Sequence, residues 1–194
     1  MKKIITISVF LFFGSACAQN LDFKILRSLN QKEMPIWDKT MEGFSFSVNP
    51  LIPVTVVGIW ANGYLKKDEI MMRNGYKSAI TIAFAALTSA GLKYTIDRPR
   101  PYKTYPSEIT ARTHSGSYSF PSGHTTSAFA MATALSLSYK EWYVAVPAYL
   151  YAGIVGYSRM RLGVHFPTDV LAGMVLGIGS GLLVWKLDRL INNK

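Results

Sequence analysis

The sequence predicts an all-α membrane protein, a transmembrane helical bundle of about five membrane helices with an N-terminal signal or anchor and short surface helices. Hydrophobic residues make up 49% of its 194 residues and charged residues only 16%, whereas an average soluble domain is about 25% charged. Long stretches carry no charge, and glycines recur at four-residue steps near the C-terminus. The length suits a single domain, which we place at residues 19–194.

Residues 1–18 predict a signal peptide, with an uncleaved membrane anchor as the alternative. Two lysines and an apolar run at residues 4–13 precede the small residues Ala16 and Ala18, a pattern typical of cleavage after Ala18. The apolar run is short for a membrane-spanning helix, which favours cleavage. Lipid attachment at Cys17 is a third alternative, and the residues before it fit that signal less well.

Five apolar segments follow, at residues 44–65, 78–96, 125–139, 142–158 and 169–187. A soluble amphipathic helix shows a charge every turn or two on its wet face, but most of these segments carry none. Their lengths approach or reach the roughly 17–25 residues that a membrane-spanning helix needs. Residues 20–42, before the first apolar segment, have an amphipathic pattern that Pro35 interrupts. This pattern predicts helices along the membrane surface.

Small residues in the last apolar segment predict close contact between helices. Gly173, Gly177 and Gly181 stand four residues apart, which lets helix backbones approach closely in lipid. Tight packing in a soluble bundle is the alternative explanation of the same spacing.

The order of the segments predicts where the functional loops lie. If the chain emerges outside after a signal peptide, five crossings place the loops 97–124 and 159–168 on the same outer side. The long loop 97–124 is rich in Pro, Ser, Thr, Gly and Tyr, and such loops often carry function. We therefore expect a multi-pass protein of the inner (plasma) membrane whose site faces the periplasm or exterior.

Charge and cysteine content narrow the choice of partners. A net charge of +10 suits nucleic acid, an anionic membrane surface or an anionic substrate. The basic residues form no dense run and lie between apolar segments, which favours a membrane and a phosphate over nucleic acid. Cys17 is the only cysteine, so thiolate metal sites and an intrachain disulfide are excluded. We expect no metal and no cofactor.

Three clusters of polar residues lie at the ends of the apolar segments, and each has a structural alternative. Lys93 stands seven residues before Arg100, yet a lone Lys at a membrane helix end usually extends to the interface. Ser122, Gly123 and His124 open the next helix, where backbone N–H groups favour anions. Ser122 could instead be only a helix cap.

The third cluster joins His165 to Asp169 at a helix start that Pro167 favours. The four-residue spacing can bring the carboxylate to one imidazole nitrogen and leave the other free to attack. The alternative is an aspartate that only complements the helix dipole. With Arg159, the clusters supply two histidines, a carboxylate and three cations on one membrane face. Phosphoryl transfer requires such a set, although this reasoning does not separate nucleophile from acid beyond the preference that Asp169 gives to His165.

The chain resembles the type 2 phosphatidic acid phosphatase superfamily, in its membrane lipid phosphatase branch. The family signature of K-x6-RP, PSGH and SR-x5-H-x3-D is matched in full at residues 93–101, 121–124 and 158–169. The apolar segments extend the resemblance over about 44–187. It implies a hydrolase of a lipid phosphate monoester or diphosphate, of the undecaprenyl-diphosphatase, phosphatidylglycerophosphatase or lipid A phosphatase type. It also implies a phosphohistidine intermediate without a metal.

The resemblance assigns a role to each signature residue. His165 is expected to be the nucleophile, with Asp169 orienting it. His124 is expected to protonate the leaving alkoxide and then to activate water. The phosphoryl oxygens are expected to bind the remaining signature residues Lys93, Arg100, Arg159, Ser122 and Gly123.

Other polar residues are expected to be structural. We interpret Arg98, Lys103, Arg112 and Arg161 as solvated surface charges and place His114 in a mobile loop. Tyr94, Tyr102 and Tyr105 suit an interfacial aromatic belt.

Three alternative functions share parts of this pattern: a soluble periplasmic acid phosphatase, a vanadate-dependent haloperoxidase and a non-enzymatic membrane protein with the same fold. The uncharged stretches argue against the first, the short apolar chain against the second and the complete signature against the third. The sequence leaves the oligomeric state open.

Overall fold

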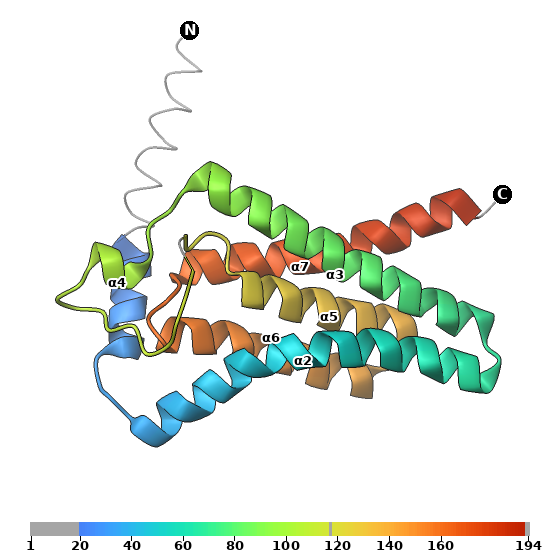
Figure 1. Ribbon diagram of the computed structural model, residues 1–194, viewed down its shortest axis with the longest axis horizontal. Coiled ribbons are helices and arrows are strands. Elements are labelled where there is room, and N and C mark those ends of the chain that lie inside the picture. The colour runs from blue at the N-terminus through green and yellow to red at the C-terminus, as the bar shows by residue number, and fades with distance from the viewer. Residues whose placement is uncertain (1–19, 117, 193–194) are drawn as a thin grey trace, which may run out of the picture.

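The computed structural model describes residues 20–116 and 118–192, and all the regular elements in these ranges are helices (Figure 1). A helical segment at residues 20–30 comes first. It is followed by α2 (Pro35–Lys66), α3 (Glu69–Ile96), α4 (Pro101–Thr104), α5 (Gly123–Tyr139), α6 (Trp142–Arg161) and α7 (Pro167–Asn192). The helical fold class is confirmed, and the predicted signal segment lies outside the described residues.

Helix α5 forms the centre of the bundle because it contacts α2, α3, α6 and α7. Its sequence is rich in Ala, Ser and Thr, and the side chains of Ala128, Ala130, Ala132 and Ala134 are completely buried. Small side chains allow four helices to surround one axis at close range. Large apolar side chains instead cover the outer surface of the other helices, where they suit contact with lipid.

Three helices are long and apolar enough to cross a membrane: α2, α3 within the stretch Glu69–Thr104, and α7. Helices α5 and α6, with 17 and 20 residues, lie against them and complete the bundle. The prediction of a transmembrane helical bundle is therefore supported, whereas the number of about five crossings stays a prediction.

The glycines of α7 bring it close to α5, as their spacing predicts. A Cβ atom added to Gly177 would lie 2.8 Å from the backbone nitrogen of Ala130 and 2.9 Å from Cβ of Phe129. A Cβ atom at Gly173 would lie 2.8 Å from the carbonyl oxygen of Ser122. All three distances are too short for real atoms, so this contact requires glycine at these positions.

The start of α2 differs from the prediction. The helical pattern is interrupted before Pro35, as predicted, but no separate surface helix follows, because Pro35 occupies the first turn of α2, which continues for 32 residues. Proline fits this position because the backbone N–H groups of the first turn have no acceptor within the helix, so the missing N–H of proline costs no helical hydrogen bond. Only the segment at residues 20–30 remains as a separate helix, and it packs Leu26 against Ile109 and Phe166.

The alternating directions of the long helices bring the polar clusters to one end of the bundle. Figure 1 shows the loop after α3, the start of α5 and the turn between α6 and α7 at the same end, beside α4. The prediction that the loops 97–124 and 159–168 share a side agrees with this arrangement. The turns between α2 and α3 and between α5 and α6 lie at the opposite end.

Candidate active site

His165 lies in the turn between α6 and α7 and is almost completely buried, with 2% of its surface exposed. Its Nε2 atom is 3.2 Å from Nη1 of Arg100, and its Nδ1 atom is 3.6 Å from Oδ2 of Asp169. Within residues 20–116 and 118–192, Nδ1 has no hydrogen-bond partner. Burial lowers the pKa of His165 to about 3, and the nearby charge of Arg159 acts in the same direction. The imidazole is therefore uncharged at neutral pH.

Two buried guanidinium groups lie in this site. Arg100 is held by Nε donating to the carbonyl of Gly116 at 2.7 Å and Nη1 donating to the carbonyl of Val164 at 2.8 Å. Arg159 donates from Nη1 to the hydroxyl of Ser45. In the part of the chain that the structure describes, neither guanidinium forms an ion pair with a carboxylate, and Nε of Arg159 has no partner. A buried charge without a counterion is costly, so these groups provide a site for an anion.

Lys93 and the start of α5 form the wall of the site next to these arginines. The Lys93 ammonium donates to the carbonyls of Pro121 at 2.7 Å and Tyr118 at 3.2 Å. It is partly buried and holds the loop before α5. A Cβ atom at Gly123 would come no closer than 3.9 Å to any described atom counted around it, at Cε of Lys93. The start of α5 therefore lies in ordinary van der Waals contact with the Lys93 side chain at this point.

Ser122, a predicted phosphate ligand, lies at the N-cap position of α5. Its side chain is completely buried, and its hydroxyl lies 2.8 Å from Oγ1 of Thr125. Its backbone N–H donates to the carbonyl of Asp169 at 3.0 Å, which ties the start of α5 to the start of α7. The residue thus fixes the two helix ends that carry the histidines.

Arg98 is not the solvated surface charge that the sequence predicted. Its Nη1 atom lies 2.6 Å from Oδ1 of Asp169, and its Nη2 atom lies 2.8 Å from Oδ2 of Asp22. Asp22 is buried and also accepts a hydrogen bond from the backbone N–H of Thr168 at 2.9 Å. An ion-pair chain from Asp22 through Arg98 therefore holds the carboxylate that faces His165.

Arg161 and Arg112 are likewise not solvated, contrary to the prediction. Nε of Arg161 lies 2.7 Å from Oδ1 of Asp38, and Nη2 of Arg112 donates to the carbonyl of Asn30 at 2.6 Å. Asn30 in turn binds the backbone of Thr110 on both its amide atoms. These contacts fasten the long loop to the first turn of α2 and to the helical segment before it.

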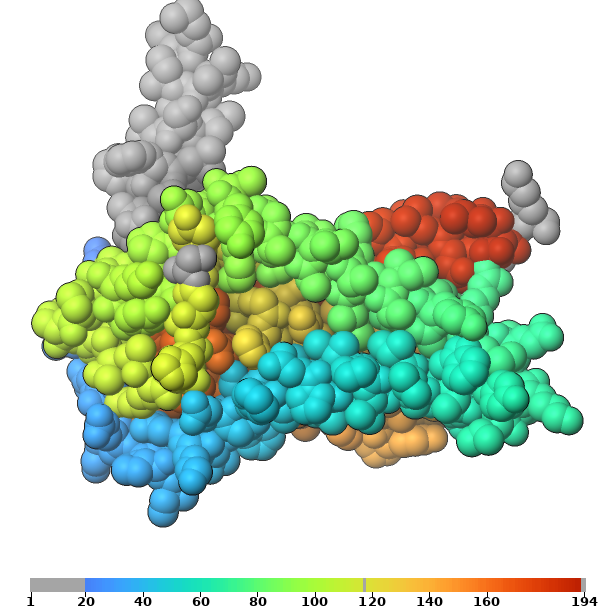
Figure 2. Space-filling model, viewed as in Figure 1, coloured from blue at the N-terminus to red at the C-terminus, as the bar shows by residue number. Residues whose placement is uncertain are grey.

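Two hollows meet at His124. The smaller, of about 280 Å³, lies between α2, α3 and α5, and small or apolar side chains such as Ala86 and Ala90 line much of it. Figure 2 shows atoms of α5 at the bottom of a gap between α2 and α3. The larger hollow, of about 570 Å³, lies between α2 and the long loop and reaches Arg159.

The described residues contain no group of three His, Cys, Asp or Glu side chains that could hold a metal ion. The side chains around His165 are instead mainly cationic, and such a set fits an anion. A helical membrane bundle that gathers histidines and buried cations at one end defines the class of phosphoryl-transfer enzymes that act at a membrane.

Comparison with known families agrees with this class. Residues 75–192 match the PAP2 superfamily, and the chain belongs to that superfamily. The family resemblance predicted from the signature is therefore confirmed.

Individual relatives cover most of the chain. The lipid A 4'-phosphatase of Bacteroides thetaiotaomicron is 26% identical over 183 residues, which cover 86% of this chain and 76% of that protein. The crystal structure of LpxE from Aquifex aeolicus superimposes with a TM-score of 0.73 at 27% identity and covers 86% of this chain and 95% of LpxE.

A second crystal structure, of a transmembrane PAP2 type phosphatidylglycerolphosphate phosphatase from Bacillus subtilis, also has a TM-score of 0.73. It is 28% identical and covers 99% of this chain and 98% of that protein. The chain is therefore a membrane protein and a phosphoric ester hydrolase of the lipid phosphatase type.

Proposed function

We propose that this protein hydrolyses a lipid phosphate monoester or diphosphate through a covalent phosphohistidine at His165, without a metal ion. The observation that carries the proposal is the pair of buried guanidinium groups, Arg100 and Arg159, beside an uncharged and buried imidazole. The guanidinium groups attract a phosphoryl group, and the imidazole offers a nitrogen lone pair to its phosphorus.

In the first step, Nε2 of His165 attacks the phosphorus while the bond from phosphorus to the leaving oxygen breaks. Nε2 is the nitrogen on the side of Arg100, whereas Nδ1 lies on the side of Asp169. Burial and the nearby cations lower the pKa of His124 to about 4 before the substrate binds, so His124 takes up its proton as the anionic substrate binds. It then gives this proton to the leaving oxygen, which departs as an alcohol or, from a diphosphate, as a lipid monophosphate. Asp169 stabilises the positive charge that develops on the attacking ring.

In the second step, His124 accepts a proton from water as the water oxygen attacks the phosphorus of the phosphohistidine. The nitrogen–phosphorus bond breaks, inorganic phosphate leaves and His165 regains its neutral form. The guanidinium groups and the Lys93 ammonium balance the charge on the phosphoryl oxygens in both steps. The backbone N–H of Gly123 opens α5 and adds a hydrogen bond from a helix start.

The site is proposed to face the periplasm or exterior of the inner (plasma) membrane. This orientation is supported by the shared end of the loops 97–124 and 159–168, together with the predicted signal peptide at residues 1–18.

The test is phosphate release by the purified full chain from a panel of lipid phosphates and diphosphates in detergent. We expect the His165→Ala variant to lose all measurable activity, and radiolabelled phosphate from the substrate to be trapped on the wild-type chain as an acid-labile adduct. A Lys140→Ala variant at the opposite end serves as the control and should keep full activity. Phosphate release by folded His165→Ala would overturn the mechanism.

A further inference from the structure

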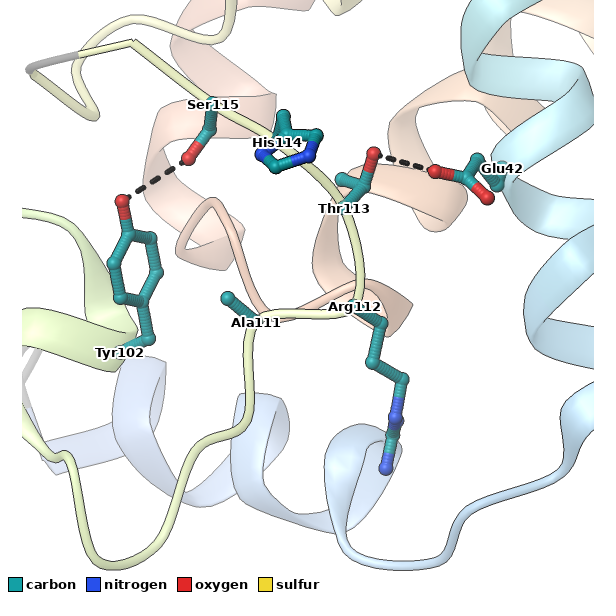
Figure 3. Close-up of a pocket in the computed structure, with 7 residues that line it drawn as sticks. All are labelled: Glu42, Tyr102, Ala111, Arg112, Thr113, His114 and Ser115. Atoms are coloured by element: carbon teal, nitrogen blue, oxygen red, sulfur yellow. Dashed lines mark hydrogen bonds between the residues drawn. The ribbon is translucent and has the colours of Figure 1, made fainter.

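The hollows at the two ends of the bundle differ in their relation to the catalytic groups. The hollow in Figure 3, of about 570 Å³, lies between α2 and the long loop, where the Thr113 hydroxyl donates to Glu42 at 2.9 Å. It shares Glu42, Thr113 and His114 with the hollow that reaches Arg159. A separate pocket of about 300 Å³ lies at the opposite end of the bundle and shares no residue with these hollows. Its occupant is therefore not the group that reacts at His165.

This pocket lies between the beginning of α3, the end of α5 and the last turns of α7. Four of its lining side chains are cations, namely Arg73, Lys77, Lys140 and Arg189. Asp188 is the only carboxylate among the described residues that line it. The cations thus exceed the carboxylate by three charges, and such an excess attracts an anion.

Asp188 fixes the two cations of α3 in the wall of the pocket. Arg73 donates to Oδ1 of Asp188 from Nη2 at 2.7 Å and from Nε at 3.0 Å, and the Lys77 ammonium lies 3.4 Å from Oδ2. The side chain of Lys77 is 12% exposed, and its ammonium lies 4.7 Å from the ring centre of Trp185. A ligand therefore meets two cations that are already ordered, which lowers the entropy cost of binding.

The other two cations of the pocket have no such partner. Within residues 20–116 and 118–192, neither Lys140 nor Arg189 forms an ion pair with a carboxylate. Both side chains are exposed. The planar guanidinium of Arg189 can bind two oxygens of one phosphate group at the same time. These two side chains are therefore available to an anion in the pocket.

The level of the pocket along the helices matches that of lipid headgroups. The uncharged stretch 78–92 of α3 begins directly after Lys77, and the uncharged stretch 170–185 of α7 ends directly before Lys186. The pocket thus lies where the apolar part of both helices ends. Trp185 lies at the same boundary, where indole rings are enriched in membrane proteins. Basic pockets between membrane helices at this level bind the phosphates of lipid headgroups.

We propose that this pocket binds the phosphate group of an anionic phospholipid from the leaflet opposite to the catalytic site. A volume of about 300 Å³ is at the lower limit of the roughly 300–1,000 Å³ of ligand pockets, which suits a headgroup. The three helices around the pocket carry Lys93, His124 and Asp169 near their other ends. The bound lipid therefore stabilises the helices that build the catalytic site, and it is not the substrate.

The test measures lipid binding to the purified full chain by native mass spectrometry, in detergent with phosphatidylglycerol or with phosphatidylcholine of the same acyl chains. Arg189→Gln removes a cation from the pocket. Lys186→Gln is the matched control, because it removes an exposed cation three residues away on α7 that does not line the pocket.

We expect Arg189→Gln to weaken the binding of one phosphatidylglycerol about tenfold, because hydrogen bonds to a charged group are lost. Lys186→Gln should leave this affinity nearly unchanged. Phosphatidylcholine should bind the wild type more weakly, because its phosphate is balanced by its own cation. An equal loss of binding in both variants would show attraction to the basic surface as a whole and would overturn the proposal, as would equal affinity for the two lipids.

Thermal unfolding provides a second measurement and separates a lipid from free phosphate. Phosphatidylglycerol should raise the melting temperature of the wild type and of Lys186→Gln more than that of Arg189→Gln, because a ligand that binds only the folded state stabilises it. Inorganic phosphate alone should give a much smaller rise. A rise as large as that with the lipid would assign the pocket to free phosphate and overturn the lipid assignment.

These measurements do not depend on phosphate release, because the pocket shares no residue with the hollows at the catalytic site. A chain that hydrolyses lipid phosphates but binds no phosphatidylglycerol at Arg189 would refute this proposal alone.

Discussion

At the scale of single residues, the burial of His165 predicts how the free energy of unfolding depends on pH. The folded chain keeps this imidazole uncharged because burial lowers its pKa from 6.5 to about 3. The unfolded chain takes up a proton near pH 6.5, so between these two values it binds more protons than the folded chain. The contribution of His165 to the free energy of unfolding is thus fully present above pH 6.5 and is lost as pH falls.

We therefore expect the melting temperature of the wild type in detergent to decrease between pH 6.5 and pH 4 more steeply than that of a His165→Gln variant. Thermal unfolding followed at several pH values measures both slopes. Equal slopes would show that His165 is accessible to protons in the folded protein. Any loss of activity near pH 6 belongs to another group, because the nucleophile stays uncharged there.

The ion-pair chain from Asp22 through Arg98 to Asp169 predicts a positioning role for Arg98. Its guanidinium lies 2.6 Å from Oδ1 of Asp169 but is absent from the contacts of His165 among the described residues. Arg98→Ala should lower kcat about a hundredfold through misplacement of Asp169, with a much smaller change in KM. Arg98→Lys should recover part of kcat.

Steady-state kinetics of the two variants at matched melting temperature measure this split. A loss confined to stability, or an equal effect of Arg98→Lys and Arg98→Ala, would contradict a positioning role. Asp22→Asn provides an independent comparison, because it weakens the far end of the same chain and should lower kcat in the same direction by a smaller factor.

The signature residues were predictable from the sequence, whereas the ion pairs that link Asp22, Arg98 and Asp169 were not. The difference lies in how far apart the partners are in the sequence. His165 and Asp169 are four residues apart at a helix start, so local geometry predicts their proximity. Arg98 and Asp22 are 76 residues apart, and only the packing of the segment 20–30 on this end joins them. The contact of the Ser122 hydroxyl with Thr125 is also local, because the two residues are three apart at a helix start, and the role of Ser122 as a phosphate ligand stays a prediction.

At the scale of elements, the contact between α5 and α7 depends on glycine. A Cβ atom at Gly177 would overlap the carbonyl oxygen of Thr126 and the backbone nitrogen of Ala130, whereas one at Gly179 would meet no described atom within 4 Å. Gly177→Ala should therefore lower the melting temperature by forcing the helices apart, a change that costs about 1–3 kcal/mol. Gly179→Ala, two residues away, should leave it unchanged or raise it.

Thermal unfolding in the same detergent compares the two variants directly. Equal melting temperatures for both would show that the helices separate without cost at this point. The four-residue glycine spacing made this contact predictable, because glycines four residues apart lie on one helix face and let a neighbouring backbone approach closely.

The start of α2 was less predictable. The amphipathic first turns of this helix resemble a surface helix because Asp38 and its neighbours face the polar loops at the site end. Local composition does not distinguish a surface helix from the polar end of a longer one. The ion pairs of Asp38 with Arg161 and Arg112 make these residues the polar end of the long helix α2.

At the scale of the whole molecule, the alternating helices place every signature residue at one end, and this follows from the order of the apolar segments in the sequence. A loop after an odd number of crossings cannot share a side with a loop after an even number. The shared end of the loops 97–124 and 159–168 was therefore predictable without any contact between them. Which side of the membrane this end faces depends on charge and signal, not on packing.

This sidedness makes a prediction that labelling can test. Cys17 is the only cysteine, so a Cys17→Ser chain gives a background without thiols. Into it we would place one cysteine at exposed Ser107 in the long loop and another, in a separate chain, at exposed Glu141 in the turn between α5 and α6.

We expect a membrane-impermeant thiol reagent added to intact cells, with the outer envelope opened, to label Ser107→Cys. Glu141→Cys should react only after the inner membrane is made permeable, since the two positions lie at opposite ends of the bundle. The reverse pattern would place the site on the cytoplasmic face and remove the support that the signal peptide gives to the orientation. Labelling of both positions in intact cells would mean that the helices do not cross the membrane, because a spanning bundle separates its two ends by about 30 Å of hydrocarbon.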